Sequence, residues 1–264
     1  MNSKRRLRGR PKSFYDKSAQ SKILSLDRAL NVLDCLSQNS GMTLTEIVET
    51  LDQSPATIHR ILSTYEKRQI VEMDTATQEW FIGSESFRFG SAYLRRSGVV
   101  ERARPFMREL MEDTGETANL GTEVRGEVMF LSQVETHENI RAFFPPGTKS
   151  PMHASGIGKA LLAHAEPSKI AKYLDRENLV SFTANTISSP AALHNELLKI
   201  KDQGYAFDNE EKSTGMRCVA ASISNSFGEV IAGISISGPS IRLPLDRIDQ
   251  IGKMVREKAA LLSR

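Results

Sequence analysis

Two alternating segments in the C-terminal half carry small polar side chains that could bind a small molecule. They are Arg217-Cys218-Val219-Ala220-Ala221 and Ile234-Ser235-Ile236-Ser237. In a strand, residues two apart point to the same face of the sheet. Cys218, Ser235 and Ser237 could therefore project from neighbouring strands on one face, where small polar groups leave a hollow.

A helix that begins near Ser155-Gly156-Ile157 would supply complementary chemistry. The backbone N–H groups of a first helical turn lack partners, and the positive end of the helix dipole favours a carboxylate there. Gly156 would permit a close approach. Together these features predict a small, mostly preformed pocket for a short organic acid, in which hydroxyl and thiol groups orient a second oxygen.

Less specific interpretations of the same residues stay open. A cysteine in an apolar strand is commonly a small buried hydrophobe, and Ser235 and Ser237 could simply face solvent. Cys218 could also be a thiol nucleophile with His153 or His194 as its base. Since the sequence contains no nucleophile elbow, metal-ligand spacing or phosphate-binding loop, we expect neither an enzyme nor a bound cofactor or metal.

A second set of candidate residues lies on a predicted helix that starts after Ser54, with Pro55 at its first position. Its apolar face is Ile58, Ile61, Leu62 and Tyr65. The opposite face is small or rich in donors and lacks acidic groups: Ala56, Thr57, His59, Arg60, Ser63, Thr64 and Lys67. Such a face fits a DNA major groove, with Thr57 and Arg60 donating to bases, Thr64 and Lys67 near phosphates, and His59 at either.

The elements around this helix predict a winged helix-turn-helix. Ser25 could cap a first helix with Leu26, Leu30, Leu33 and Leu36 on its apolar face, and Thr43 and Glu46 form a capping box for a second helix, residues 44–51. A short turn leads to the third helix. Residues 70–73 and 79–82 then alternate as a hairpin, in which Trp80 is expected to pack on the core. A helical hairpin packed on another protein is the alternative.

The N-terminal arm, residues 1–20, is polar and basic and is expected to be disordered. The first 22 residues hold eight basic side chains against one acidic one, a net charge of +7, whereas the whole chain carries +3. The remainder is therefore mildly acidic. Arg8-Gly9-Arg10-Pro11 resembles the core of an AT-hook, whose arginines enter a narrow minor groove; a solvated tail without a fixed pose is the alternative.

The length of 264 residues favours two domains, and only two cysteines occur, without a CxxC spacing. Apolar runs fall well short of the roughly 20 residues of a membrane-spanning helix, so we expect a cytoplasmic protein without membrane contact. The predicted boundaries are a disordered arm at 1–20, a DNA-binding domain at 21–83, a linker helix at 84–98 and an effector-binding domain at 99–264.

The predicted C-terminal domain is α+β. A helix from Val99 to Gly115 precedes strands at 117–123, 127–134 and 140–144. Helices at 156–164, 168–174 and 191–203 follow, then strands at 204–208, 217–224 and 229–237 and a last helix from Pro244 to about Leu262. A C-terminal domain that serves only to oligomerise an architectural DNA-binding protein is a further alternative.

Nearly the whole chain resembles the IclR family of bacterial regulators. The matching segments are Ser25-Leu26-Asp27-Arg28-Ala29-Leu30, Pro151 to Ala160, Asp208-Asn209-Glu210-Glu211 followed by Gly215 to Ala221, and Ile234 to Pro239. The resemblance implies a homodimer or homotetramer on palindromic double-stranded operators, and an effector domain with a GAF-like or PAS-like sheet.

The resemblance also implies which residues form the effector pocket. It implies effector contacts from Gly156, Ile157, Asp208, Cys218, Ser235 and Ser237, with Ala142 and Phe143 in the apolar wall, although Asp208 read alone could be a turn residue. Asn209 stands where the family more commonly has a second aspartate, directly after Asp208. The segment Met152-His153-Ala154-Ser155-Gly156 is similar to the branch that senses small 2-oxo acids, so we expect glyoxylate or pyruvate as effector.

Overall fold

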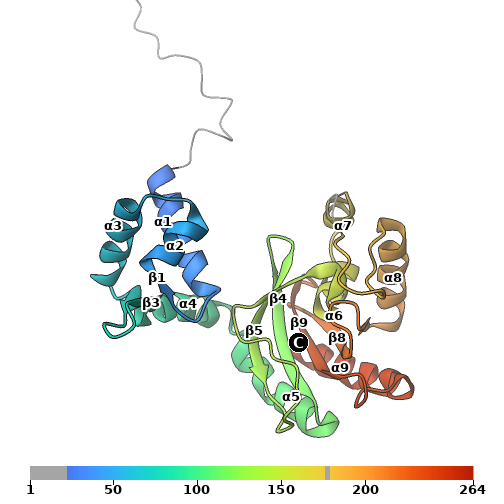
Figure 1. The fold of residues 1–264 in the computed structure, drawn as a ribbon. Coiled ribbons are helices and arrows are strands. Elements are labelled where there is room, and N and C mark those ends of the chain that lie inside the picture. Colours follow the sequence, from blue (N-terminus) through green and yellow to red (C-terminus); the bar gives the residue numbers. More distant parts are fainter. Residues whose placement is uncertain (1–22, 176–178, 264) are drawn as a thin grey trace, which may run out of the picture. The chain divides into compact units, whose positions relative to one another are not determined.

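The computed structural model describes residues 23–175 and 179–263, which form two compact units that divide after Tyr93 (Figure 1). The basic arm, with Arg8 and Arg10, lies outside the described residues. The division falls within helix α4 (Ser84–Ser97), in the segment predicted as a linker helix. Among the described helices, none is long and apolar enough to cross a membrane.

The N-terminal unit is a winged helix-turn-helix. Its elements are α1 (Leu24–Ser37), β1 (Met42–Thr43), α2 (Leu44–Leu51), α3 (Pro55–Glu66), β2 (Val71–Met73) and β3 (Glu79–Ile82). The antiparallel strand order is β1-β3-β2, so β1 adds a strand to the predicted hairpin. Trp80 is 5% exposed and packs with Val32, Ile47, Ile58 and Leu62.

Side-chain caps set the starts of α2 and α3. The Thr43 and Glu46 side chains form the predicted capping box at α2. The Ser54 hydroxyl accepts from the Thr57 N–H, and Pro55 occupies the first turn of α3. These bonds satisfy backbone donors that a helix start leaves without partners.

The prediction for the first helix is wrong at its start. The helix begins at Leu24, and its N-cap residue, Ile23, makes no side-chain cap; Ser25 lies inside the first turn. Leu26 and Leu30 are exposed, while Leu36 is buried. The core of this unit includes α1 only from Val32 onward. Leu26 and Leu30 therefore lie beyond the part of the helix that packs against the core.

The C-terminal unit is built on a six-stranded antiparallel sheet in the order β6-β5-β4-β9-β8-β7. Its strands are β4 (Thr117–Val124), β5 (Glu127–Val134), β6 (Lys149–Pro151), β7 (Ala206–Asn209), β8 (Met216–Ser224) and β9 (Val230–Pro239). Arg125 and Gly126 both have positive φ, which suits the two-residue hairpin between β4 and β5.

Helices cover both faces of this sheet (Figure 1). One apolar cluster joins α5 (Val99–Thr114) and α9 (Ile248–Leu262) to alternate residues of the central strands, such as Val219 and Ile234. A second cluster joins α6 (Gly156–Ala163), α7 (Pro167–Leu174) and α8 (Pro190–Gln203) to the opposite face, which includes Ala220. The polar face predicted for β8 and β9 is therefore the one that faces α6.

The predicted strand at 140–144 is wrong. Residues 140–145 are irregular, and β6 takes the edge position beside β5. The backbone of this segment is held by side chains instead: Arg242 Nη2 donates to the Ile140 carbonyl (2.8 Å) and Gln133 Nε2 to the Ala142 carbonyl (3.3 Å). Pro145 and Pro146 follow directly, and proline cannot donate to a strand ladder.

Candidate functional site

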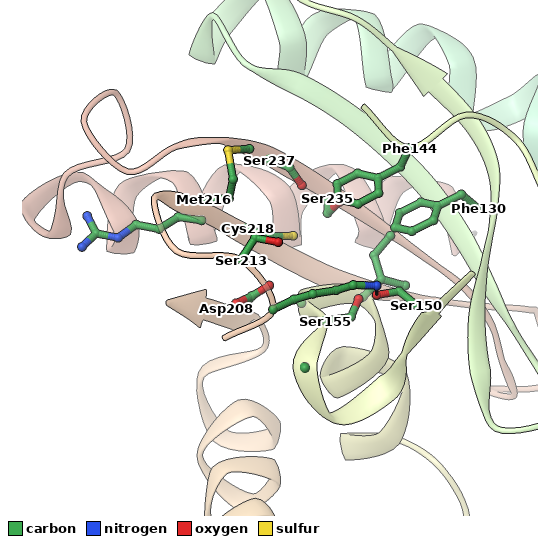
Figure 2. A pocket seen from close by; sticks show the side chains of 15 residues that line it. Phe130, Phe144, Ser150, Ser155, Asp208, Ser213, Met216, Cys218, Ser235 and Ser237 are labelled. Atoms are coloured by element: carbon green, nitrogen blue, oxygen red, sulfur yellow. Dashed lines mark hydrogen bonds between the residues drawn. The ribbon is translucent and has the colours of Figure 1, made fainter. Parts of the chain in front are cut away.

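A small cavity of about 60 Å³ lies between α6 and the sheet of the C-terminal unit (Figure 2). Strand register aligns Asp208 of β7 with Cys218 of β8, and Cys218 with Ser237 of β9. Ser235 is two residues from Ser237 on the same face of β9. All four residues line the cavity, together with Gly156 and Ile157 of α6. The structure therefore brings together six of the eight residues predicted for this pocket.

Glycines let α6 lie against the sheet. A Cβ on Gly156 would be 2.7 Å from Cys218 Sγ, and a Cβ on Gly233 of β9 would be 2.9 Å from Ile157 Cγ2. The Ser155 hydroxyl accepts from the Gly158 N–H, and the Ser155 carbonyl from the Lys159 N–H. The N–H groups of Gly156 and Ile157 precede that first intrahelical bond, so they remain available to a ligand.

Among the described residues, no well-formed hydrogen bond reaches the Ser235 hydroxyl, although the hydroxyl lies close enough to the Cys218 thiol to interact with it. Its side chain is fully buried, and it lines the cavity. A buried polar atom without a partner costs about 1–3 kcal/mol relative to one that is paired. Because a thiol is only a weak hydrogen-bond partner, this hydroxyl would gain from a ligand oxygen or a water in the cavity.

A polar network that was not predicted from the sequence contacts the Ser237 hydroxyl. Asn119 Nδ2 donates to Ser237 Oγ at 3.2 Å, and Gln133 Nε2 donates to Asn119 Oδ1 at 3.0 Å. Asn119 is fully buried on β4. The position of Asn119 in a largely apolar strand could have predicted this network, because a buried asparagine side chain requires hydrogen-bond partners.

The apolar wall differs from the prediction. Phe130 and Phe144 line the cavity, and their rings stack with centroids 4.8 Å apart (Figure 2). Ala142 and Phe143 are not among the lining residues; Ala142 is buried, while Phe143 is 62% exposed. Because the segment 140–144 is irregular, its side chains do not alternate as in a strand, and the wall is displaced to Phe144.

A buried group of charged residues lies next to β7; of its members Asp208 lines the cavity, whereas Glu211 and Lys159 do not. Burial raises the pKa of Asp208 to about 6, against the attraction of Lys159. Burial likewise raises the pKa of Glu211 to about 7. Lys159 of α6 is fully buried, with Nζ 2.5 Å from Glu211 Oε1 and 2.6 Å from the Phe207 carbonyl. A lysine on the apolar α6 was a sequence signal for this buried pair.

Cys218 has the surroundings of a neutral donor. Burial raises the pKa of its thiol to about 11, so the thiol is protonated at neutral pH. The ring nitrogens of His153 contact the Tyr173 hydroxyl (3.2 Å) and the Val180 carbonyl (3.0 Å), and His194 is exposed on α8. Neither the protonated thiol nor the surroundings of the two histidines match a thiolate that is paired with a histidine base.

The DNA-facing residues predicted for the third helix lie on α3 or, for Lys67, directly after its last residue, and they differ in exposure. His59, Arg60, Thr64 and Lys67 are exposed, whereas Thr57 and Ser63 are half-buried. The Thr57 hydroxyl lies 2.9 Å from that of Ser54. The Thr64 hydroxyl donates to the Arg60 carbonyl at 2.7 Å, so its proton is already used within the helix. Arg60 and Lys67 thus remain as the strongest available donors of this face.

A groove between α1 and α3 adds Arg28 to this surface. Arg28 and Arg60 both line it, along with Thr57 and Thr64. Two guanidinium groups beside one groove suit a phosphate backbone. Sequence reasoning placed Arg28 only within a family motif, because its approach to α3 depends on how the helices pack.

Family models match both units. The model described as "Bacterial transcriptional regulator IclR C-terminal" matches residues 91–264, and the model described as "IclR helix-turn-helix domain" matches residues 25–75. The chain belongs to the IclR family. The resemblance noted in the sequence is thereby confirmed, as is the combination of a winged helix-turn-helix with a mixed helix-and-sheet effector domain.

Individual IclR-family proteins match over most of this chain. It is 54% identical over 241 residues to the HTH-type transcriptional regulator BhcR of Paracoccus denitrificans, covering 91% of this chain and 86% of that protein. It is 35% identical over 255 residues to the transcriptional repressor IclR of Escherichia coli, covering 96% and 93%. The crystal structure of Thermotoga maritima IclR matches with a TM-score of 0.75 at 29% identity, covering 92% and 98%.

Membership of the IclR family gives the chain its general role. It is a DNA-binding transcriptional regulator, in which the α3 surface and the α6 cavity belong to separate units.

Proposed function

We propose that the α6 cavity binds a small organic acid and that this acid changes the affinity of the α3 surface for a palindromic operator. The observation that carries the proposal is the buried Ser235 hydroxyl, which has the weakly bonding Cys218 thiol beside it and borders the same cavity as the N–H groups at the start of α6, those of Gly156 and Ile157. A carboxylate suits the helix N-terminus. A second oxygen suits the hydroxyl and thiol groups of Ser235, Ser237 and Cys218.

The size of the cavity favours glyoxylate or pyruvate. A cavity of about 60 Å³ is several times the roughly 10–15 Å³ that one water needs, so it has room for a ligand larger than water. It is well below the roughly 300–1,000 Å³ of pockets for drug-sized ligands, which favours a small acid over an aromatic one. The stacked Phe130 and Phe144 rings limit enlargement on the apolar side.

The regulator is proposed to act as a repressor and as a dimer or tetramer. Two-fold symmetric operators require paired recognition helices spaced about 34 Å apart, one turn of DNA. Helix α4 contributes to both units, since they divide after Tyr93 within it, and it is the proposed route of communication. Coupling between two binding sites is reciprocal, so operator DNA must also change the affinity for the acid.

We propose no catalytic activity for this chain. The raised pKa of Cys218 and the contacts of His153 support this view. Turnover of glyoxylate or pyruvate by the purified protein would contradict it.

The test is an operator gel shift at fixed salt concentration, using the upstream region of the regulator's own gene and a panel of small acids. We expect glyoxylate or pyruvate to change operator affinity and to raise the melting temperature of the protein. A larger acid that does both, while glyoxylate and pyruvate do neither, would refute the proposed effector class. Cys218→Ala should weaken only the effector response, and Arg60→Ala only operator binding.

A further inference from the structure

Lys212 places a positive charge beside the cavity, and its direct hydrogen bond among the described residues goes to a neutral hydroxyl. It lines the cavity, and its Nζ donates to Ser150 Oγ at 3.0 Å. Burial lowers the pKa of Lys212, and the nearby charges of Asp208 and Glu127 act against that shift, although neither carboxylate forms an ion pair with Lys212 among the described residues. Lys212 is half-buried. A partly desolvated cation whose direct contact is a neutral hydroxyl, with carboxylates only at longer range, gains from direct contact with an anion.

The backbone on which Lys212 stands is firmly held. The Glu211 N–H donates to Asp208 Oδ1 at 2.8 Å, and the Glu211 carbonyl accepts from Thr186 Oγ1 at 2.5 Å. The Glu211 carboxylate pairs with the buried Lys159 at 2.5 Å. These buried contacts fix the residue before Lys212, so the lysine is positioned at the cavity as part of a built site.

The other cations near the cavity are already compensated. Arg217 donates to Asn209 Oδ1 at 2.9 Å and to the Leu243 carbonyl at 2.8 Å, and it lies 3.4 Å from Glu210. Lys159 is paired with Glu211. Of the three, Lys212 is the one that forms no direct ion pair among the described residues, so its ammonium group is the one that can pair with a ligand.

Lys212 also lies at the correct end of the cavity to share a carboxylate with α6. Its partner Ser150 is on β6, which leads through a short 3-10 turn to Ser155, the N-cap residue of α6. Ser150 and Ser155 border the same cavity (Figure 2). A carboxylate between the two would meet both the ammonium group and the helix N-terminus.

We propose that Lys212 leaves Ser150 to pair with the carboxylate of the effector, and that it thereby selects acids over uncharged molecules of the same shape. This inference rests on the proposed function, because it assigns the charge specificity of the proposed acid site. The second oxygen of the ligand remains with Ser235, Ser237 and Cys218.

The test compares a charged and an uncharged ligand of the same shape. Calorimetric titration of the full chain with pyruvate and with pyruvamide, its neutral amide, would be repeated on Lys212→Met. We expect the substitution to weaken pyruvate binding about tenfold to a hundredfold, the scale of one lost charge-assisted hydrogen bond, and to change pyruvamide binding little. Lys212→Arg should retain most of the preference for the acid.

A matched control and distinct outcomes separate this inference from the proposed function. Lys201→Met removes the same charge from an exposed site on α8 and should alter neither ligand. Unchanged pyruvate affinity in Lys212→Met, or an equal loss for pyruvate and pyruvamide, would overturn the role of Lys212 while the acid site stands. Failure of the parent protein to bind pyruvate, glyoxylate or any other short acid would overturn both.

Discussion

The α3 surface and the α6 cavity present polar groups in opposite ways. On α3, the donors lie within one short helix and are largely exposed, so helical spacing alone puts them on one face. In the cavity, the polar groups come from α6, β6, β7, β8, β9 and the segment 210–215, and several are buried. A site on one element is determined by local sequence, whereas a site between elements depends on packing. Substitutions should therefore act differently in the two regions.

The largest expected effect is the loss of effector binding in Gly156→Val. Its Cβ would lie 2.7 Å from Cys218 Sγ, so the side chain would fill the cavity or push α6 from the sheet. Overpacking of this kind costs about 1–3 kcal/mol in stability, and we expect effector affinity to fall about a hundredfold or more. Calorimetry with pyruvate measures the loss.

The control is Gly90→Val on α4, where an added Cβ meets no atom within 4 Å. It should leave effector affinity unchanged. Normal pyruvate binding by Gly156→Val would show that the effector lies elsewhere and would end the contrast between the two regions.

Arg60→Ala should give the next largest effect, confined to DNA. Loss of one arginine contact to a base costs about 1–3 kcal/mol, or roughly fivefold to 150-fold in operator affinity. Because Arg60 is exposed, the melting temperature should hardly change. Titration of operator DNA at several salt concentrations measures this, with Arg256→Ala on α9 as a control of equal charge. An equal loss in both variants would indicate a general charge effect.

Ser235→Ala should separate stability from function. Removal of a buried hydroxyl whose protein partner is at most the weakly bonding Cys218 thiol is expected to be close to neutral in stability. If the hydroxyl binds the effector, the same change weakens effector affinity by about 0.5–1.5 kcal/mol, roughly twofold to twelvefold. Thermal unfolding with and without pyruvate gives both quantities. A lower melting temperature without ligand, together with unchanged affinity, would assign the hydroxyl a structural role.

The smallest effect is a dependence of effector affinity on pH. Asp208, with a pKa of about 6, is mostly ionised at pH 8 and mostly protonated at pH 5. An anion bound nearby favours the protonated carboxyl and raises its pKa further. Affinity for pyruvate should therefore increase a few-fold as the pH falls from 8 to 5.5, and Asp208→Asn should flatten this profile. The same slope in the variant would assign the effect to Glu211 or another group.

The strongest sequence predictions depended on local interactions. The capping box of Thr43 and Glu46 and the Ser54 cap of α3 involve residues within one turn of each other, and the structure contains both. The alternation of β8 and β9 placed Cys218, Ser235 and Ser237 on one face, because strand geometry has a period of two. The leucine repeat of α1 and the segment 140–144 failed for a common reason: periodicity describes what an element could bury, and only its neighbours decide whether it is buried.

The sequence by itself determined the winged helix and the order of most strands and helices along the chain. Six of the residues at the cavity also followed from the sequence, with the help of the family resemblance. Tertiary structure decided the rest. It placed Phe144 in the wall where Phe143 was expected, linked Asn119 to Ser237, buried Lys159 against Glu211 and left Lys212 bonded to the Ser150 hydroxyl and not to a carboxylate. These features join residues distant in the chain, and the electrostatic state of each depends on which groups packing leaves beside it.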